Sequence, residues 1–467
     1  MLNFNQPLSP IGTSDLRTPK FDQAKITWKE TKEKFSAHPY MEYQKVLGFG
    51  GFGIVQQWST YNPDGSMGED IAIKATVASG REMHAIALQN EIRWCKEFKG
   101  REHLMQLRDV RDDPTTEGAY NDETDPAPCM IMEVLPHGNL SDTMDRVRLA
   151  KATLNPMVVD ENEKLVEYFP CRILWRVLLC MTRACLEIAF PPPDTPQDPP
   201  QDPPPDPEQP PQLYRGQDIP GQNPRPIVHF DIDLTNVFVG PFAEPTDTEH
   251  EKFPICKLAD YGIMCEWDDD WELSEKRQRS AFGKPSYKAP EHVDRRRVGI
   301  PGVYGAHTNI WGIGITLFLL ICTTYRFDNR PGRSYQRRLG NGISIDTYGY
   351  TLLDDEYGPV NPFYEDIDLQ LRETIARCLA VNGAQRPTLR QLLALAVQNI
   401  GEGDRKAQEA GASQMPNDIY ATRPKLDEPE PDALLDRFMR NYFYDAAPVQ
   451  DPYGPYWDRL TTPEPSN

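Results

Sequence analysis

The sequence predicts an α+β protein in which a small β-rich lobe precedes a larger α-rich lobe. Two observations indicate this order. Between residues 40 and 136 most apolar residues fall in short strand-like runs, with one helical pattern among them. After residue 138 the apolar residues recur at helical spacing in longer segments. A proline-rich stretch interrupts the second lobe, and polar segments flank the two lobes on either side.

The first lobe is expected to be a sheet that carries one main helix. The runs EYQKVLG, IVQQWST and IAIKATV have strand character, and YNPDG between the last two is typical of a turn. The segment REMHAIALQNEIRWCKEF has helical spacing, and HLMQLRDV and PCMIMEVL resume the strand pattern. In the second lobe, CRILWRVLLCMTRACLEIAF (171–190) and the apolar segment 309–323 are predicted helices.

Three segments are predicted to lie outside this core. Residues 1–20 form a polar, flexible leader, and residues 401–467 an acidic Pro-rich tail with a short helix at DALLDRFMRNYF. Within the second lobe, residues 191–226 form an insert whose first 21 residues contain twelve Pro. Such a composition favours an extended polyproline-II chain. It is either a docking segment for an SH3- or WW-type partner or an inert solvated loop.

Composition excludes several classes of function. The formal charge of −20 argues against general nucleic-acid binding, which needs clustered Lys and Arg. The nine cysteines have neither CxxC pairs nor metal-like spacing, which fits a reducing compartment and buried structural thiols. No secretory signal is visible, and the longest apolar run has about sixteen residues where a membrane span needs roughly 20. We therefore expect an intracellular protein, cytoplasmic or nuclear, without a membrane partner.

Several residues suggest phosphate handling. LGFGGFGIV (47–55) places Gly48, Gly50 and Gly53 between two strand-like runs, where backbone N–H groups can approach phosphates closely. Lys74 follows at the end of a strand, and Glu91 in the next helix can pair with it. Taken singly, each feature has a simpler interpretation: a glycine-rich turn, a surface lysine and a glutamate on a helix face.

The order of the motifs carries the argument. A glycine loop, AIK, a helix Glu, HFDIDLTN (229–236), DYG (260–262) and APE (289–291) follow one another along the chain. As a set they resemble the eukaryotic protein kinase family over about residues 40–400. The resemblance implies a two-lobed protein kinase fold in residues 21–400, with an N-lobe at about 40–136 and a C-lobe at about 137–400. It also implies ATP and Mg²⁺ as cofactors and a protein substrate.

The resemblance assigns a role to each matching residue. Asp231 would accept or orient the substrate hydroxyl proton, and Asn236 and Asp260 would bind Mg²⁺. Lys74, paired with Glu91, would hold the α- and β-phosphates. The residues expected to contact the nucleotide are Gly48, Gly50, Gly53, Val55, Ala72, Lys74, Met132, Glu133, Leu135 and Phe238. Met132 would be the gatekeeper, with the backbones of Glu133 and Leu135 facing adenine. Glu291 would pair with Arg386 as a structural bolt.

Three positions depart from the family pattern. Phe230 stands where many kinases have the Arg that receives an activation-loop phosphate, so this resembles a non-RD kinase whose switching does not use that phosphate. Tyr261 replaces Phe in DFG and keeps an aromatic ring. Asn309 replaces the Asp that usually braces the catalytic loop, and its amide can still accept a hydrogen bond, more weakly than a carboxylate.

A fourth departure involves a charge pair. Asp233 stands where Ser/Thr kinases have a Lys that touches the transferred phosphate, and Lys284 stands where its partner Thr is expected. We hypothesise that Asp233 and Lys284 form a swapped ion pair that returns positive charge close to the γ-phosphate, and we include both in the catalytic set. The alternative is two unrelated solvent-facing substitutions.

Two functions follow. The first is an active protein kinase that phosphorylates Ser or Thr, because Lys74, Glu91, Asp231, Asn236 and Asp260 are all present. The second is a pseudokinase scaffold that binds ATP or partner proteins without catalysis, which the changes at Asp233, Lys284 and Asn309 favour.

Overall fold

The structure, a computed structural model, describes residues 19–49, 53–76, 81–110, 129–153, 165–190, 215–216, 222–293, 304–354, 362–411, 423–426 and 428–444. These residues divide into two compact units. Unit 1 contains the described residues up to 99 and from 105 to 135; unit 2 contains residues 100–104 and the described residues from 136 to 444. Together they combine helices and sheets, which confirms the predicted α+β class.

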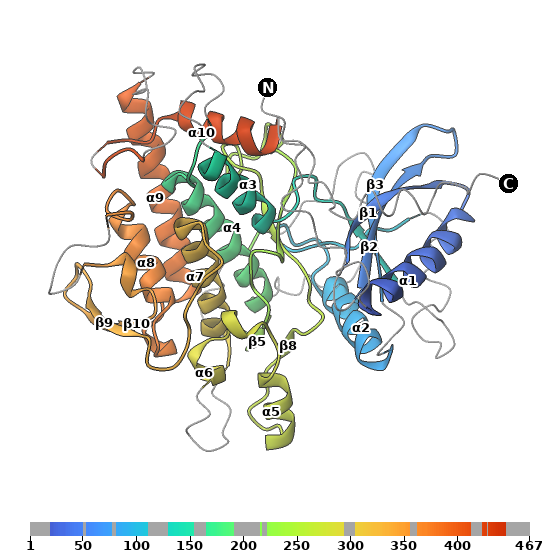
Figure 1. The fold of residues 1–467 in the computed structure, drawn as a ribbon, viewed down its shortest axis with the longest axis horizontal. Helices are drawn as coiled ribbons and strands as arrows, with labels where there is room; N and C mark the ends of the chain where they lie inside the picture. Colours follow the sequence, from blue (N-terminus) through green and yellow to red (C-terminus); the bar gives the residue numbers. More distant parts are fainter. Residues whose placement is uncertain are drawn as a thin grey trace, which may run out of the picture. The chain divides into compact units, whose positions relative to one another are not determined.

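Unit 1 is a four-stranded antiparallel sheet in the order β1-β2-β3-β4. The strands are β1 Met41–Phe49, β2 Gly53–Tyr61, β3 Met67–Thr76 and β4 Cys129–Glu133. Helix α1, Pro19–Ser36, packs on one face of the sheet (Figure 1). Its Trp28 and Phe35 join alternate apolar residues of the strands, such as Ile54 and Ile73, in one buried cluster. Alternation along each strand thus commits one face of the sheet to this core.

The prediction for unit 1 was right in most elements and wrong in one. The three runs before residue 78 form β1 to β3, and helix α2 spans Arg81–Glu97 as predicted. HLMQLRDV is not a regular strand, because its residues bridge two different partners: Leu104 pairs with Leu258 within unit 2, and Leu107 with Met132 within unit 1. Helix α1 was not predicted.

Unit 2 is mainly helical. Its helices are α3 Leu140–Thr153, α4 Cys171–Ala189, α5 Leu273–Ser280, α6 Pro290–Val293, α7 Ala306–Cys322, α8 Leu369–Cys378, α9 Leu389–Ala410 and α10 Asp432–Met439. Helices α4 and α7 are the predicted apolar helices. Eighteen residues of α4, all except Arg183, are buried, because α7, α9 and strand β7 pack around it (Figure 1). Short turns of 3-10 helix lie at Pro285–Tyr287, Tyr350–Leu352 and Gly383–Gln385.

Three two-stranded antiparallel ribbons complete unit 2. Strand β5, Ile227–Val228, pairs with β8, Cys265–Glu266, and β6, Val237–Val239, pairs with β7, Cys256–Leu258. These two ribbons hold the ends of the predicted catalytic loop, residues 229–236. The third ribbon joins β9, Tyr335–Arg338, to β10, Ser344–Thr347.

The C-terminal part of the described chain is packed on unit 2. Helix α9 continues past residue 400, where we placed the start of the tail, and α10 is followed by a π-helical turn at Arg440–Tyr444. The Tyr442 backbone carbonyl accepts a hydrogen bond from Arg146, and Phe438 packs against Phe169. The predicted short helix is therefore present, and its aromatic residues are buried.

Other predictions concern the whole chain. All nine cysteines are free, as expected without a disulfide framework. Among the helices that the structure describes, none is both long and apolar enough to cross a membrane. The leader up to residue 18 and residues 191–214 and 217–221 of the insert lie outside the described residues, so an SH3- or WW-type partner stays a prediction.

A buried charge network joins three helices of unit 2. Arg172 and Arg176 of α4 are almost fully buried, and both donate to Asp404 of α9. Arg172 also pairs with Asp432 at the start of α10, at 2.7 Å. Buried guanidinium groups require such partners, since an unpaired buried charge is strongly destabilising.

We expect Asp404→Ala to lower the free energy of unfolding by about 3 kcal/mol, because it leaves the two guanidinium groups without their shared carboxylate. Glu402→Ala is the matched control on the same helix. Its solvent-exposed pair with Arg405 should contribute much less to the free energy of unfolding. Urea unfolding of both variants measures the difference, and equal losses would show that the network does not stabilise unit 2.

Candidate active site

The predicted nucleotide-contacting residues of unit 1 lie together on the second face of its sheet. Val55 is paired with Lys74, and Ala72 with Met132. Directly paired residues of neighbouring strands point to the same side, as do residues two apart along a strand. These four residues therefore share the face opposite to the core with α1, which contains the alternate residues of the same strands.

Lys74 and Glu91 form a close ion pair within unit 1. Lys74 Nζ lies 2.7 Å from Glu91 Oε2, and the two side chains are only 15% and 5% exposed. Glu91 stands on the buried side of helix α2, which places its carboxylate over strand β3. Such a pair holds the lysine ammonium in one direction.

The glycines differ in what the structure requires of them. A Cβ at Gly53 would lie 2.3 Å from the carbonyl oxygen of Ala75, so β2 and β3 could not approach as they do with any other residue. A Cβ at Gly48 would meet nothing within 4 Å. Gly50 lies outside the described residues. A structural need thus accounts for Gly53 independently of any ligand.

The remaining nucleotide-contacting predictions fall on β4, its end and β6. The Glu133 N–H already donates to the Gln106 carbonyl, and the Glu133 carboxylate accepts from Gln106 and Arg108. The backbone N–H of Glu133 is thus committed within unit 1, and the contact of its backbone with adenine stays a prediction. Leu135 is buried, and Phe238 lies in strand β6, half-buried.

In unit 2, the loop between β5 and β6 brings Asp231 and Asn236 together. The Asn236 side-chain amide donates to the Asp231 backbone carbonyl at 2.8 Å and to Asp231 Oδ2 at 2.9 Å. Both acceptors can only accept, so the NH₂ group of Asn236 must face Asp231. Asn236 Oδ1 points the other way, and it accepts no hydrogen bond from the residues that the structure describes.

This arrangement fits a hard cation. Mg²⁺ prefers carboxylate and carbonyl oxygens, and Asn236 Oδ1 is such an oxygen, oriented by its own amide. The Ala259 N–H donates to the Asn236 carbonyl at 2.9 Å, so Asp260, the next residue, is held beside Asn236. Asp260 has φ 65°, in the left-handed region that Asp adopts more readily than most residues. Asn236 and Asp260 are therefore the groups of unit 2 suited to hold Mg²⁺.

Asp231 has the electrostatics of a proton acceptor. Burial and the neighbouring charge of Asp233 raise the pKa of Asp231 to about 6, although Lys284 acts in the opposite direction. Its Oδ1 atom is buried and has no hydrogen-bond partner in the part of the chain that the structure describes. A carboxylate oxygen without a partner, in a site where the proton is held more tightly than usual, is suited to receive one.

Lys284 reaches both acidic residues of the loop. Its Nζ contacts Asp233 Oδ2 directly and lies 3.7 Å from Asp231 Oδ2. Asp233 is buried, and its other oxygen accepts from the backbone N–H and the hydroxyl of Thr235. The hypothesised ion pair is therefore present. The alternative, in which both residues face solvent, is wrong for Asp233 because its side chain is buried. Sequence analysis missed Thr235, which also accepts from Lys284 at 2.9 Å.

Asn309 braces the loop as an amide. Its Oδ1 accepts from the His229 N–H at 3.0 Å, and its Nδ2 donates to the Ile227 carbonyl at 2.9 Å. The first bond is the one expected of the residue at this position. The second needs a donor, which an ionised Asp does not have. The replacement thus exchanges charge for an additional hydrogen bond within a buried site.

The other departures from the family pattern are filled by aromatic packing. Phe230, with φ 64°, lies with His292 and Tyr304 in a cluster that includes Trp267. Tyr261 packs edge-on against His229, and its hydroxyl donates to the Leu258 carbonyl. Burial lowers the pKa of His229 to about 4, so this imidazole is neutral. An apolar ring thus occupies the place at which a phosphate-binding Arg is common.

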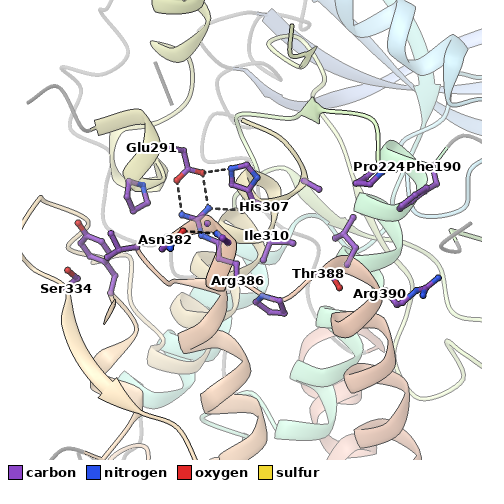
Figure 2. Close-up of a pocket in the computed structure, with 18 of the residues that line it drawn as sticks. Phe190, Pro224, Glu291, His307, Ile310, Ser334, Asn382, Arg386, Thr388 and Arg390 are labelled. Atoms are coloured by element: carbon purple, nitrogen blue, oxygen red, sulfur yellow. Dashed lines mark hydrogen bonds and ion pairs between the residues drawn. The ribbon is translucent and has the colours of Figure 1, made fainter. Parts of the chain in front are cut away.

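Glu291 and Arg386 form the predicted bolt, at 2.8 Å, and line a cavity of unit 2 with a volume of about 1150 Å³. Figure 2 shows the Glu291 carboxylate facing Arg386 and His307. Arg386 also donates to the backbone carbonyls of His307 and Ala380. None of the predicted catalytic or Mg²⁺-binding residues lines this cavity, so it is separate from the loop chemistry.

Comparison with known proteins agrees with the geometry. Residues 223–396 match the family model of the protein kinase domain. Serine/threonine-protein kinase SRK2H of Arabidopsis thaliana is 24% identical over 167 residues, 36% of this chain and 38% of that protein. Serine/threonine-protein kinase 33 of Mus musculus is 24% identical over 36% of this chain and 29% of that protein.

The name of a further relative states a different specificity. The membrane-associated tyrosine- and threonine-specific cdc2-inhibitory kinase of Drosophila melanogaster is 27% identical over 36% of this chain and 24% of that protein. The chain thus spans well under half the length of the curated relatives it matches. The loop geometry, the family model over residues 223–396 and these relatives all point to the protein kinases. This part of the chain is thus similar to the eukaryotic protein kinase family.

The swapped pair predicts a coupled effect on stability. Lys284→Met should lower the free energy of unfolding by roughly 1–3 kcal/mol, because it leaves the buried Asp233 carboxylate without its cation. The double variant Asp233→Asn with Lys284→Met should recover part of that loss. Lys276→Met serves as the control, since the half-buried Lys276 on α5 donates to the Asp269 backbone carbonyl rather than to a carboxylate. If the two single losses simply add in the double variant, the side chains are not coupled.

Proposed function

We propose that this chain is an ATP-dependent protein kinase that transfers the γ-phosphate of ATP to Ser or Thr hydroxyls of protein substrates. The observation that carries the proposal is the double hydrogen bond from the Asn236 amide to Asp231, which leaves one oxygen of each side chain for a ligand. A structural turn has no need of that arrangement. Similarity to the kinase family supports the same reaction.

Each residue has a defined task in this proposal. Asp231 Oδ1 accepts or orients the proton of the substrate hydroxyl. Lys74, held by Glu91, binds the α- and β-phosphates. Asn236 and Asp260 supply oxygen ligands for Mg²⁺, which neutralises phosphate charge when it is bound. Units 1 and 2 correspond to the N-lobe and C-lobe of the kinase fold, within a domain of residues 21–400.

Lys284 supplies the cation of the phosphate-transfer site. In the family pattern that cation comes from the position of Asp233, whose buried carboxylate here anchors Lys284 instead. The Lys284 side chain is 44% exposed, and its Nζ lies 3.7 Å from the Asp231 carboxylate. An ammonium group beside the proton acceptor and open to solvent is suited to contact a transferred phosphate.

A second function, a pseudokinase scaffold, has one observation in its favour. Asp233, Asp231 and Asp260 all raise local negative charge, and the first and third contribute to the raised pKa of Asp231. Such a site would repel phosphates if Lys284 and the metal did not compensate. The enzyme is the better proposal, because a scaffold does not require an oriented Asn236 or a Lys74–Glu91 pair.

We expect the purified chain, treated with phosphatase and then freed of it, to transfer ³²P from γ-labelled ATP with Mg²⁺ to a generic basic protein. Phosphatase treatment should not abolish the activity, because Phe230, packed against Tyr304, stands where many kinases have the Arg that binds an activation-loop phosphate. Asp260→Ala should lower the rate by at least about a hundredfold. Phosphoamino-acid analysis then identifies the hydroxyl.

ATP binding without any transfer, in the wild type as in Asp260→Ala, would favour the scaffold instead. Transfer to Tyr alone would retain the kinase and correct its specificity. Lys276→Met is the matched control for expression and purification, and it should retain full activity.

We also predict an acidic limb in the pH profile. Asp231 must be deprotonated to accept a proton, so kcat/KM should rise with pH through about 6 and level above it. Asp233→Asn removes a negative charge that raises the pKa of Asp231, so it should move this limb to lower pH. Initial rates between pH 5 and 8 at fixed free Mg²⁺ measure both profiles. A limb that stays in place in Asp233→Asn would mean that Asp231 is not the titrating group.

A further inference from the structure

Four side chains of unit 2, far apart in the sequence, converge at a buried point away from the catalytic loop. One ligand atom each from His103, Cys180 and His250 lies within 4.8 Å of the other two. The Cys256 thiol lies close enough to the Cys180 thiol to interact with it. All four residues are at most 3% exposed. They come from the segment 100–104, helix α4, the loop before β7 and strand β7 itself.

The orientation of the two imidazole rings is the key observation. His103 Nδ1 lies 3.0 Å from Glu187 Oε1, and His250 Nδ1 lies 2.6 Å from Asp247 Oδ2. A carboxylate can only accept, so each Nδ1 carries its proton. The two Nε2 atoms are 3.3 Å apart. Two buried rings that both pointed lone pairs at each other would repel, so this contact needs a positive particle between the two atoms, either a proton or a metal ion.

The separation of the two Nε2 atoms is that of two nitrogen ligands of one zinc ion. Zn²⁺ binds imidazole nitrogen at about 2.0–2.1 Å and thiolate sulfur at about 2.3 Å in a tetrahedral arrangement. Two tetrahedral nitrogen ligands at that distance are separated by roughly 3.3–3.4 Å, which matches the separation of the two Nε2 atoms. Metal-binding histidines commonly donate their second ring N–H to a carboxylate, as both do here.

Charge in the surroundings also favours a cation. Four carboxylates lie in this part of unit 2, those of Glu102, Glu187, Asp247 and Glu249. Two guanidinium groups, Arg183 and Arg215, pair with three of them. The fourth carboxylate, that of Glu187, faces His103 instead. Arg215 occupies the Glu102 and Asp247 side of His250, which leaves the Nε2 side for an ion.

We propose that unit 2 binds one structural Zn²⁺ through His103 Nε2, His250 Nε2, Cys180 Sγ and Cys256 Sγ. The ion joins the segment 100–104 to helix α4 and strand β7, with Glu187 and Asp247 orienting the two histidines. This site lies outside the phosphate-transfer residues, and the proposal is independent of whether the chain has kinase activity.

The test measures zinc in the full-length chain after dialysis against metal-free buffer. We expect about one zinc ion per wild-type chain, because a single site of this type holds one ion. Cys180→Ser should lose the zinc. Cys185→Ser is the matched control, since Cys185 is equally buried on the same helix and lies outside the cluster, and it should keep the zinc. Asp247→Asn should weaken zinc affinity by about 10–100-fold.

Cobalt substitution provides a readout that does not depend on the variants. Co²⁺ added to the zinc-depleted, reduced wild type should give a thiolate-to-cobalt charge-transfer band and the visible bands of a tetrahedral site, both lost on adding excess zinc. A wild type that holds no zinc and gives no such bands would mean that the histidines share only a proton, and would overturn the proposal. Equal zinc and cobalt spectra in Cys180→Ser and wild type would overturn it as well.

Discussion

Unit 2 depends on one constraint: the charged groups buried on helix α4 must find partners, because an unpaired buried charge is costly. Arg172 and Arg176 find them in α9 and α10. Glu187 finds them in the segment 100–104 and in Gly216, and Cys180 in Cys256 and the two histidines. One helix thereby fixes segments that lie more than two hundred residues apart in the sequence.

The same constraint explains how the catalytic loop accommodates its unusual residues. A buried Asp at position 233 is acceptable because Thr235 and Lys284 bond both of its oxygens. An amide at position 309 is acceptable because a carbonyl lies where its NH₂ group can donate. Each change from the family pattern has therefore been matched by a partner nearby. Such matching keeps the loop folded, because buried polar groups must be paired whether or not the site transfers phosphate.

The sequence patterns predicted the helices, strands and ion pair that depend on neighbouring residues or on motif register. They missed the contacts that depend on the path of the chain through the fold. Strands β1 to β3 and helices α2, α4 and α7 follow from spacing, and the Asp233–Lys284 pair follows from motif register. HLMQLRDV alternates like a strand, but its bridges go to two units. Helix α1 was missed because its apolar residues do not all lie on one face: Ile26 is exposed, whereas Trp28 is buried. The convergence of His103, Cys180 and His250 has no signature, since no short spacing relates them.

The insert begins and ends at nearly the same point of unit 2. The Ala189 carbonyl, at the end of α4, accepts from the Arg225 N–H at 2.9 Å, and Gly216 is held by Arg183 and Glu187. The cost of closing a loop between fixed ends grows only with the logarithm of its length. The chain between these anchors can therefore be lengthened, shortened or replaced by a folded module with little effect on the helices beneath. The chain that follows residue 190 is therefore a place at which a segment can be exchanged for another while the core of unit 2 stays the same.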